Sequence, residues 1–277
     1  MIQLEVAPAA HAGTVREIIR QLGSVLIAFS GGVDSSLLLK LAQEELGNER
    51  VVAALASSPA YPSAEQEQAR QIARELGARL VEVDTSEVEL DAYRINRPDR
   101  CFHCKEELFD KLQPLQQQLG LDWLAYGANA DDAGDHRPGH ASALRRGVRF
   151  PLLEGGMGKG EIRLLARQLG LSNWNKSPMA CLSSRVPHGQ PISEAILRQI
   201  GEAEAVLQRL GLEGVRVRHH GEVARIEVAA TDLNRVVERR QEVIEGVRAA
   251  GYLFVALDLE GYRMGSLNRS WRGGGGE

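Results

Sequence analysis

The hexapeptide Ser30-Gly31-Gly32-Val33-Asp34-Ser35 lies between two apolar runs, residues 25–29 (VLIAF) and residues 37–41 (LLLKL). This order predicts a strand, a tight glycine turn and the start of a helix. Such a turn directs free backbone N–H groups and the positive end of a helix dipole toward one point, where a phosphate binds well. Glycine allows the sharp turn and leaves room for an anion beside the backbone. The segment therefore predicts a phosphate-binding loop.

This loop differs from two other phosphate-binding patterns. It lacks the lysine that precedes the final Ser/Thr of a Walker A loop, and no G-x-G-x-x-G is present. The alternative without a ligand is a plain strand–helix turn capped by Asp34 or Ser35. The segment resembles the pyrophosphate loop (PP loop) of the ATP pyrophosphatases, which cleave ATP to AMP and pyrophosphate and transfer AMP to a substrate oxygen. That resemblance implies ATP and Mg²⁺ as ligands.

Strands and helices alternate in the first part of the chain. This order predicts a parallel sheet with helices on both faces, whose ligands bind at the carboxyl ends of the strands. The loop at residues 30–35 and the segment 127–132 (GANADD) both follow predicted strands. Residues 131–160 are rich in Gly, Arg and Asp and are expected to form loops, and Pro114 is expected to bend or break its helix. The expected strands are residues 24–29, 51–57, 79–84 and 123–126, and the expected helices are residues 14–22, 34–46, 63–76, 102–119 and 159–169.

The pattern changes after residue 192. A helix at 194–210, strands at 215–219 and 223–228, a helix at 233–249 and a strand at 253–259 predict a small α+β domain. The predicted fold class is thus an α/β PP-loop ATP pyrophosphatase domain with a smaller C-terminal α+β domain. The predicted division is a PP-loop domain with the cysteine site at 1–192, a substrate or oligomerisation domain at 193–268, and a flexible tail at 269–277.

Composition excludes several classes of protein. The chain has 277 residues, of which 43% are hydrophobic and 25% charged, as is typical of a soluble globular protein. No apolar stretch has the length of a membrane span and no secretory signal is apparent, so we expect a cytoplasmic protein without a membrane partner. The net charge of −4 disfavours a nucleic acid as the main partner.

Three cysteines in a chain expected in the cytoplasm point to a metal or to reactive thiols rather than to disulfides. Cys101 and Cys104 are spaced so that two sulfur atoms can face one metal, and Cys181 lies far away in the sequence. One interpretation is a zinc knuckle completed by a histidine, with Cys181 as a small buried residue. A redox C-x-x-C is a second interpretation. A third is a 4Fe-4S cluster held by three thiolates, with one iron open for an extra sulfide.

The PP loop and the cysteines also fit together chemically. AMP turns a carboxylate oxygen into a good leaving group, and the following step needs a nucleophile. No glutaminase domain is visible, so the cysteines favour sulfur over ammonia. Cys181 can also act directly, as a thiolate that attacks the activated carbonyl and gives up its own sulfur, with Lys176 and Arg185 lowering its pKa.

Six motifs together resemble the LarE-type ATP-dependent sulfur transferases, and the resemblance runs from the N-terminal helix to about residue 268. These enzymes act on pyridinium-3,5-biscarboxylic acid mononucleotide, the precursor of the nickel-pincer nucleotide of lactate racemase. They adenylate a ring carboxylate and replace its oxygen with sulfur, on both carboxylates in turn. The motifs are SGGVDSSLLL at 30–39, RCFHCK at 100–105, GANADD at 127–132, RPG at 137–139, ACLSSR at 180–185 and RVRHH at 216–220.

The family has two branches. In one, a single cysteine at the position of Cys181 sacrifices its sulfur; in the other, three cysteines hold a 4Fe-4S cluster that carries a non-core sulfide. Cys101 and Cys104 place this chain with the cluster branch. The resemblance therefore implies Cys101, Cys104 and Cys181 as cluster ligands.

The resemblance also implies roles for other residues. The PP loop would hold the ATP phosphates, with Asp34 near Mg²⁺, while Arg216 and Arg218 on one face of a strand would grip the phosphate or carboxylates of the substrate. An exposed strand face is the alternative for these arginines, Glu227 is a weaker substrate candidate, and His219 and His220 are expected to be structural. The implied ATP-binding residues are Ala28, Ser30, Gly31, Gly32, Asp34, Ser35, Ser58, Gly127 and Asn129, and the implied catalytic residues are Asp34 and Cys181.

Three other functions remain open from the residues. A tRNA thiolase also combines a PP loop with three cysteines, but it needs basic surface. An amidating ligase such as an NAD or GMP synthetase leaves the cysteines unexplained, and an ATP-dependent metal or cluster carrier is the alternative that is not an enzyme. The expected partners are the pyridinium nucleotide, sulfide or a sulfur-donor system, and further copies of the chain in a homo-oligomer.

Overall fold

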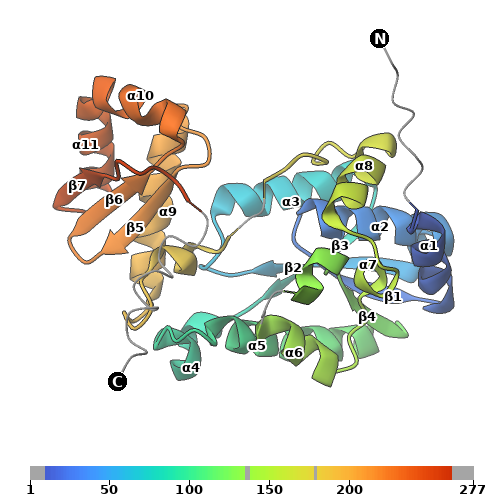
Figure 1. Ribbon diagram of the computed structural model, residues 1–277. Helices are drawn as coiled ribbons and strands as arrows, with labels where there is room; N and C mark the ends of the chain where they lie inside the picture. Colours follow the sequence, from blue (N-terminus) through green and yellow to red (C-terminus); the bar gives the residue numbers. More distant parts are fainter. Residues whose placement is uncertain (1–9, 135–137, 178–179, 264–277) are drawn as a thin grey trace, which may run out of the picture. The chain divides into compact units, whose positions relative to one another are not determined.

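The computed structural model describes residues 10–134, 138–177 and 180–263, which fall into two compact units (Figure 1). The first unit contains Met1–Ser58, Ser63–Glu87 and Cys101–Met179. The second contains Pro59–Pro62, Val88–Arg100 and Ala180–Glu277. Residues 180–192, which the sequence analysis groups with the first domain, thus pack within the second unit, together with two short segments from much earlier in the chain.

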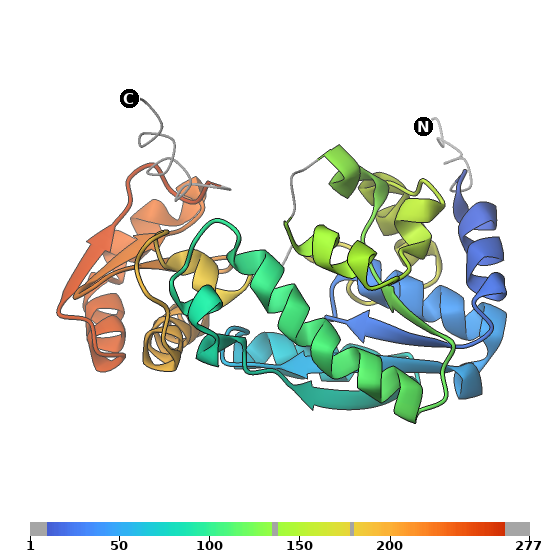
Figure 2. The same ribbon diagram turned by 90° about the horizontal axis from the view of Figure 1, so that it is seen from below.

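The first unit is built on a parallel four-stranded sheet with the strand order β3-β2-β1-β4. Helices cover both faces of this sheet, as Figures 1 and 2 show. The predicted α/β architecture of this part is confirmed. The strands are β1 (Val25–Phe29), β2 (Val51–Ser57), β3 (Arg79–Asp84) and β4 (Trp123–Tyr126), and the helices are α1 (Ala12–Gln21), α2 (Val33–Leu46), α3 (Ser63–Glu75), α5 (Arg100–Gln118, whose first residue belongs to the second unit), α6 (Pro138–Arg145), α7 (Pro151–Glu154) and α8 (Lys159–Gln168).

Strand β1 is buried along its whole length because it lies between two apolar cores. Val25, Ile27 and Phe29 belong to the core under α1, α2, α3 and α8, whereas Leu26 and Ala28 belong to the core under α5. Successive side chains of a strand point to opposite faces, which explains why this central strand is apolar without interruption. Both cores therefore fix the end of β1, from which the PP loop emerges.

The second unit contains a three-stranded mixed sheet with the order β5-β6-β7. Strands β5 and β6 form an antiparallel hairpin around Gly221, and β7 pairs with β6 in the parallel direction. The predicted small α+β arrangement is confirmed. Its elements are α4 (Asp91–Arg94), α9 (Glu194–Arg209), β5 (Arg216–His220), β6 (Val223–Glu227), α10 (Leu233–Glu238), α11 (Arg240–Ala249) and β7 (Phe254–Leu257), with a short 3₁₀ turn, η4 (Leu182–Arg185).

Three local expectations were wrong. Helix α5 continues through Pro114, because burial of Leu108, Phe109 and Leu112 in the core offsets the lost hydrogen bond. The segment 131–160 contains the helices α6 and α7 rather than loops alone. The helix expected at 233–249 is divided at Arg239 into α10 and α11. None of the helices in the described part of the chain has the length and apolar character needed to cross a membrane.

Candidate functional site

The PP loop turns between β1 and α2 at two glycines. Gly31 has φ +67, and a Cβ atom there would lie 2.6 Å from the Cβ atom of Ala69 in α3. Gly127, directly after β4, lies so close that a Cβ atom would be 2.9 Å from the backbone N of Ser35. Both positions therefore require glycine, and the close approach at Gly127 brings the end of β4 to the first turn of α2.

Hydroxyl groups brace the loop from inside. Ser35 is buried, and its Oγ accepts a hydrogen bond from the backbone N of Ser30 at 3.3 Å and donates to the carbonyl of Gly32 at 3.1 Å. The hydroxyls of Ser30 and Ser35 lie 3.2 Å apart. Two of the predicted phosphate-binding residues thus also fix the shape of the turn.

The carbonyl of Gly31 is held from outside by a segment more than 140 residues away in the sequence. The buried Asn173 donates from Nδ2 to this carbonyl at 3.0 Å and to the Oγ of Ser36 at 2.9 Å. Lys176 Nζ lies 3.5 Å from the same carbonyl and 2.7 Å from the carboxylate of Glu65. Because a peptide is planar and trans, a carbonyl turned toward Asn173 leaves the N–H of Gly32 turned the opposite way, into the loop.

Asp34, at the start of α2, is the charged centre of the loop. Lys159 Nζ lies 2.6 and 2.8 Å from its two carboxylate oxygens, and Asn129 Nδ2 donates to one of them at 3.3 Å. Lys159 is itself positioned at the start of α8, where its backbone N donates to Asp131 at 2.8 Å. The loop, the segment after β4 and the start of α8 therefore converge on one carboxylate.

Sequence reasoning missed Lys159. The available signal was a Gly-Lys pair at the start of a helix that follows an Asp-rich segment. It also missed Asn173, for which no local signal exists, because its contact with the loop depends on the packing of the whole unit.

The two residues expected to face adenosine lie at different depths. Ala28 is buried in β1, where it pairs with Ala54 on one side and Tyr126 on the other. Ser58 follows β2 and is also buried; its hydroxyl donates to the carboxylate of Glu87, and its carbonyl accepts from Gln66 at 3.2 Å. Ser58 is therefore fixed on both its polar groups at the carboxyl end of the sheet.

The three cysteines are free thiols. Cys101 is exposed and Cys104 partly buried, one turn apart at the start of α5, while the partly buried Cys181 directly precedes η4 in the second unit. The pKa of Lys105 lies above its ordinary value: burial opposes its charge, but Tyr126 and the thiols of Cys104 and Cys101 outweigh burial. Within the described residues, no group of three or more His, Cys, Asp and Glu side chains lies together as a metal site.

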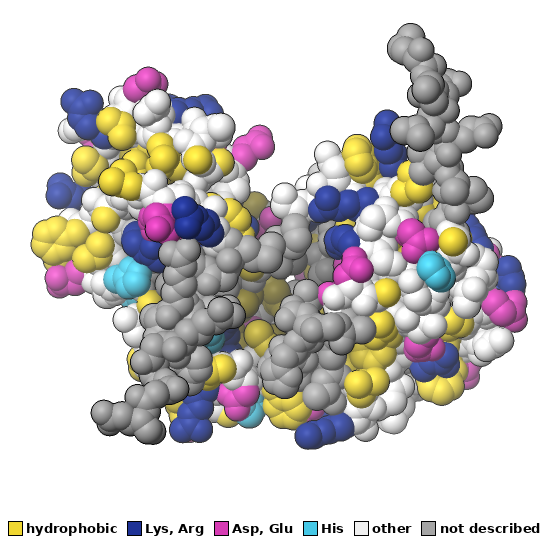
Figure 3. All heavy atoms as spheres, in the orientation of Figure 1, with side chains coloured by type: hydrophobic (Ala, Val, Ile, Leu, Met, Phe, Trp, Pro, Cys, Tyr) yellow, Lys and Arg dark blue, Asp and Glu magenta, His cyan; other side chains and the backbone are white. Residues whose placement is uncertain are grey.

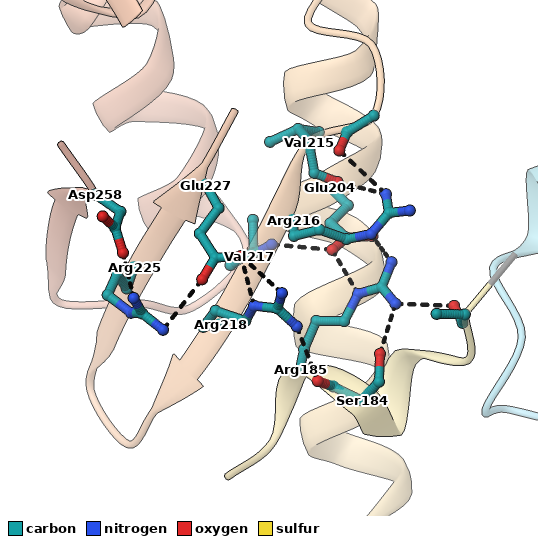
Figure 4. A network of polar contacts seen from close by, with 12 residues as sticks. Ser184, Arg185, Glu204, Val215, Arg216, Val217, Arg218, Arg225, Glu227 and Asp258 are labelled. Atoms are coloured by element: carbon teal, nitrogen blue, oxygen red, sulfur yellow. Dashed lines mark hydrogen bonds and ion pairs between the residues drawn. The ribbon is translucent and has the colours of Figure 1, made fainter. Parts of the chain in front are cut away.

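Arg185 holds the loop that contains Cys181 (Figure 4). Its side chain is 2% exposed and forms two hydrogen bonds with Glu204 of α9, at 2.9 and 3.0 Å. It also donates to the carbonyls of Ala180 and Cys181, at 2.8 and 3.0 Å. Arg185 therefore ties the backbone of Cys181 to α9, and Lys176, which pairs with Glu65 of the first unit, has a separate structural role.

Arg216 and Arg218 lie on one face of β5 as predicted, but their surroundings differ (Figure 4). Arg218 is buried, donates twice to Glu227 at 2.9 and 2.7 Å, and reaches the carbonyl of Ser184 at 2.9 Å. Glu227 is fully buried and also pairs with Arg225 at 3.2 Å. Glu227 therefore fixes the position of Arg218.

Arg216 donates to the carbonyl of Val215 at 2.9 Å and lies over the ring of Tyr262, 5.4 Å from its centroid. Within the described residues, it forms no ion pair with a carboxylate. Burial, and then the neighbouring Arg185, lowers the pKa of Arg216. Its positive charge is thus incompletely neutralised, which suits an anionic ligand.

The two histidines after Arg218 make contacts within the second unit. His219 is buried, and its Nδ1 lies 3.1 Å from the hydroxyl of Tyr252. His220 Nε2 accepts a hydrogen bond from Arg225 at 3.3 Å. Burial lowers the pKa of both imidazoles, so both favour the neutral form.

Comparison with known proteins gives the family. Residues 12–103 match the family model described as NAD synthase. An uncharacterised protein of Synechocystis is 41% identical over 257 residues, which is 92% of this chain and 96% of that protein. A glutamine-hydrolysing GMP synthase of Methanocaldococcus jannaschii is 29% identical over 57% of this chain and 54% of its own length.

A further relative matches almost the whole chain. The pyridinium-3,5-bisthiocarboxylic acid mononucleotide synthase of Lactiplantibacillus plantarum is 33% identical over 260 residues, 94% of each protein. Both the PP-loop unit and the small α+β unit lie within this match. The chain therefore belongs to the family of the pyridinium-3,5-bisthiocarboxylic acid mononucleotide synthases, the LarE family.

Proposed function

We propose that this protein is an ATP-dependent sulfurtransferase that adenylates a carboxylate of pyridinium-3,5-biscarboxylic acid mononucleotide and replaces the activated oxygen with sulfur. The observation that carries the proposal is the PP loop, with the carboxylate of Asp34 held at its start, in a chain that matches the synthase over 94% of both lengths. The relative's name specifies a dithiocarboxylic acid product, and ATP activation is the chemistry that a PP loop supplies.

The loop provides a complete set of groups for the phosphates. The N–H groups at the start of α2, the hydroxyls of Ser30 and Ser35, and Lys159 all surround the turn. Mg²⁺ usually takes one or two protein carboxylates and fills its other positions with phosphate oxygens and water. The single carboxylate of Asp34 fits this requirement, and Mg²⁺ bound there would neutralise phosphate charge.

The first half-reaction needs orientation and charge stabilisation from the protein. A carboxylate oxygen of the substrate forms a bond to the α-phosphorus, and the bond from this phosphorus to the pyrophosphate oxygen breaks. Pyrophosphate leaves with the electron pair, and no proton has to move. We assign Lys159 to the departing pyrophosphate, because its ammonium group lies beside the loop and its partner Asp34 is the proposed magnesium ligand.

We assign Arg216 to an anionic group of the pyridinium nucleotide. Its guanidinium is half-buried beside Arg185 and Arg218 without a carboxylate partner among the described residues. Arg218, which Glu227 and Ser184 hold in place, adds positive charge to the same face of β5. Glu227 is then a positioning residue rather than a substrate ligand.

We further propose Cys101, Cys104 and Cys181 as ligands of a 4Fe-4S cluster. Three thiols fit such a group, because three thiolates leave one iron open, and none of the three is consumed in a disulfide. Such a cluster, when bound, supplies an open iron that can carry a sulfide. In the second half-reaction sulfur takes the place of AMP on the carbonyl carbon, and AMP leaves with its phosphate oxygen.

Sulfur supply and assembly complete the proposal. An external sulfide or sulfur donor would restore the sulfur after each transfer. We also propose a homo-oligomer, supported by Leu253 and Phe254 beside and in the edge strand β7, which are more than half exposed. Figure 3 shows hydrophobic side chains on the surface of this unit.

The proposal is tested by incubating the anaerobically prepared protein with ATP, Mg²⁺, sulfide and the pyridinium dicarboxylate nucleotide. We expect AMP and pyrophosphate to form only when the nucleotide is present, together with a product in which sulfur replaces oxygen. Sulfur incorporation into bulk tRNA without any into the nucleotide would overturn the substrate assignment. Nothing in the comparisons favours tRNA thiolation.

A further inference from the structure

Asn96 has an unusual backbone conformation in a fully buried position. Its φ is +58, and it is the one residue other than glycine with a positive φ in the part of the chain that the structure describes. Its side chain is 0% exposed. A left-handed conformation costs a residue free energy even when it is asparagine, and it persists only where the surroundings enforce it.

The side-chain amide of Asn96 binds the segment that follows Cys181. Its Nδ2 donates to the carbonyls of Pro187 at 2.8 Å and Gln190 at 3.0 Å, with Val186 at 3.3 Å. Its own backbone carbonyl accepts from the N–H of Gly189 at 3.1 Å. One residue thus fixes the course of residues 186–190.

Arg100 extends this contact toward the cysteines. It is buried, and its Nη1 donates both to the Oδ1 of Asn96 and to the carbonyl of Ser183 at 3.0 Å. The hydroxyl of Ser183 lies 2.5 Å from that of Tyr93. All of these contacts lie within the second unit, so they do not depend on how the two units are placed.

The two ends of this network are attached to cysteines through the chain itself. Cys101 follows Arg100 directly, so their Cα atoms are about 3.8 Å apart. Cys181 precedes Ser183 by two residues, which is a separation of at most about 7 Å. The hydrogen bond from Arg100 to Ser183 therefore ties the backbone at one cysteine segment to the backbone at the other.

We propose that Asn96 is a positioning residue that sets the separation of Cys101 and Cys104 from Cys181, with Arg100 as the link. The proposal rests on the proposed function in taking these cysteines as ligands of one group. A merely structural contact would not need a left-handed asparagine joined to a buried guanidinium, because apolar packing stabilises a core without the cost of burying charge. The position of three thiols around one cluster, in contrast, has to be set closely.

The experiment measures the separation of the thiols without a cluster. The metal-free protein, with Cys104→Ser to leave one thiol in each segment, reacts with dibromobimane, whose two bromides are displaced when two nearby thiolates attack. Peptide mass spectrometry then measures the bridge between Cys101 and Cys181. The variants are Asn96→Gly, which keeps a positive φ without cost but loses the amide, and Arg100→Leu, which removes the link. Asn234→Ala, at an exposed position of α10, is the matched control.

We expect bridging to slow by at least about tenfold in Asn96→Gly and Arg100→Leu, and to be unchanged in Asn234→Ala. In the chain with all three cysteines, Asn96→Gly should also retain less iron after anaerobic reconstitution. Bridging at the unaltered rate in a folded Asn96→Gly protein, or no bridging even with Asn96 and Arg100 in place, would overturn the proposal. Bridging that depends on Asn96 in a protein that binds no iron would instead overturn the cluster and leave the positioning role intact.

Discussion

The PP loop and the cysteine segments differ in how the chain builds them. Six consecutive residues form the PP loop, and the sheet and α2 fix its shape from both ends. The cysteine segments come from residues 101–104 and from residue 181, and they are joined through contacts of residues 93–100 with residues 183–190. The first site is a property of a local sequence, whereas the second depends on long-range packing. Substitutions in the loop should therefore act on ATP chemistry alone, and those around the cysteines on sulfur transfer alone.

The largest expected effect is that of Asp34→Ala. Loss of the carboxylate removes the proposed magnesium ligand and leaves Lys159 without its partner, so AMP formation should fall by at least about a thousandfold. Pyrophosphate release measures this effect, and iron binding should be unchanged. Glu49→Ala, an exposed acidic residue of the same unit, is the control. Turnover that survives in Asp34→Ala would mean that the loop is not the ATP site.

Lys159→Ala should reduce AMP formation by about a hundredfold, because the ammonium group no longer faces the departing pyrophosphate. Lys159→Arg should restore part of the rate, since it keeps the charge. Lys40→Ala removes an ammonium group from the outer part of α2, where it pairs with Glu44, and should have little effect. If Lys159→Ala and Lys40→Ala behave alike, Lys159 does not act on the phosphates.

Gly31→Ala and Gly147→Ala form a matched pair, because both glycines have φ +67. At Gly147 no atom lies within 4 Å of an added Cβ atom, so alanine should cost only about 1 kcal/mol of unfolding free energy. At Gly31 the added atom would lie 2.6 Å from Ala69, so alanine should also displace the loop and abolish AMP formation. Chemical denaturation and pyrophosphate release measure the two effects, and equal behaviour of the variants would contradict the account.

Arg216→Ala and Arg218→Ala separate substrate binding from folding in the second unit. Arg216→Ala should raise the KM for the pyridinium nucleotide about tenfold and leave the KM for ATP unchanged. Arg218→Ala leaves the buried Glu227 with one fewer cation and should destabilise the unit by about 3–5 kcal/mol. Steady-state kinetics and thermal unfolding measure these effects. An equal rise in both KM values for Arg216→Ala would argue against its assigned role.

The smallest expected effect is on pH dependence. Burial, and then His220, lowers the pKa of His219 in the folded protein, so the unfolded chain takes up a proton that the folded chain refuses. The free energy of unfolding should therefore fall as the pH is lowered through about 6.5, by at most about 1.4 kcal/mol per pH unit for one proton. His219→Gln should flatten this slope in urea titrations between pH 7 and pH 5. An unchanged slope would show that His219 does not titrate differently on folding.

How far the sequence predicts the molecule follows the same division. Continuous apolar runs such as residues 25–29 and glycine stops predict the sheet, and the SGGVDS pattern predicts the loop, because these signals are local. Lys159 and Asn173 reach the loop only after α8 and its following segment pack against the first unit, so no short pattern reveals them. The partnership of Arg218 with Glu227 was invisible as well, since hairpin register decides which side chains face each other.

The most direct test of the account is mass spectrometry of a single-turnover mixture of the anaerobic protein, ATP, Mg²⁺ and the pyridinium dicarboxylate nucleotide. The account predicts a nucleotide with sulfur in place of one oxygen, an equal amount of AMP, and a protein chain of unchanged mass. AMP without sulfur in the nucleotide would contradict sulfur transfer. A chain lighter by one hydrogen sulfide would show that Cys181 is consumed rather than preserved as a ligand.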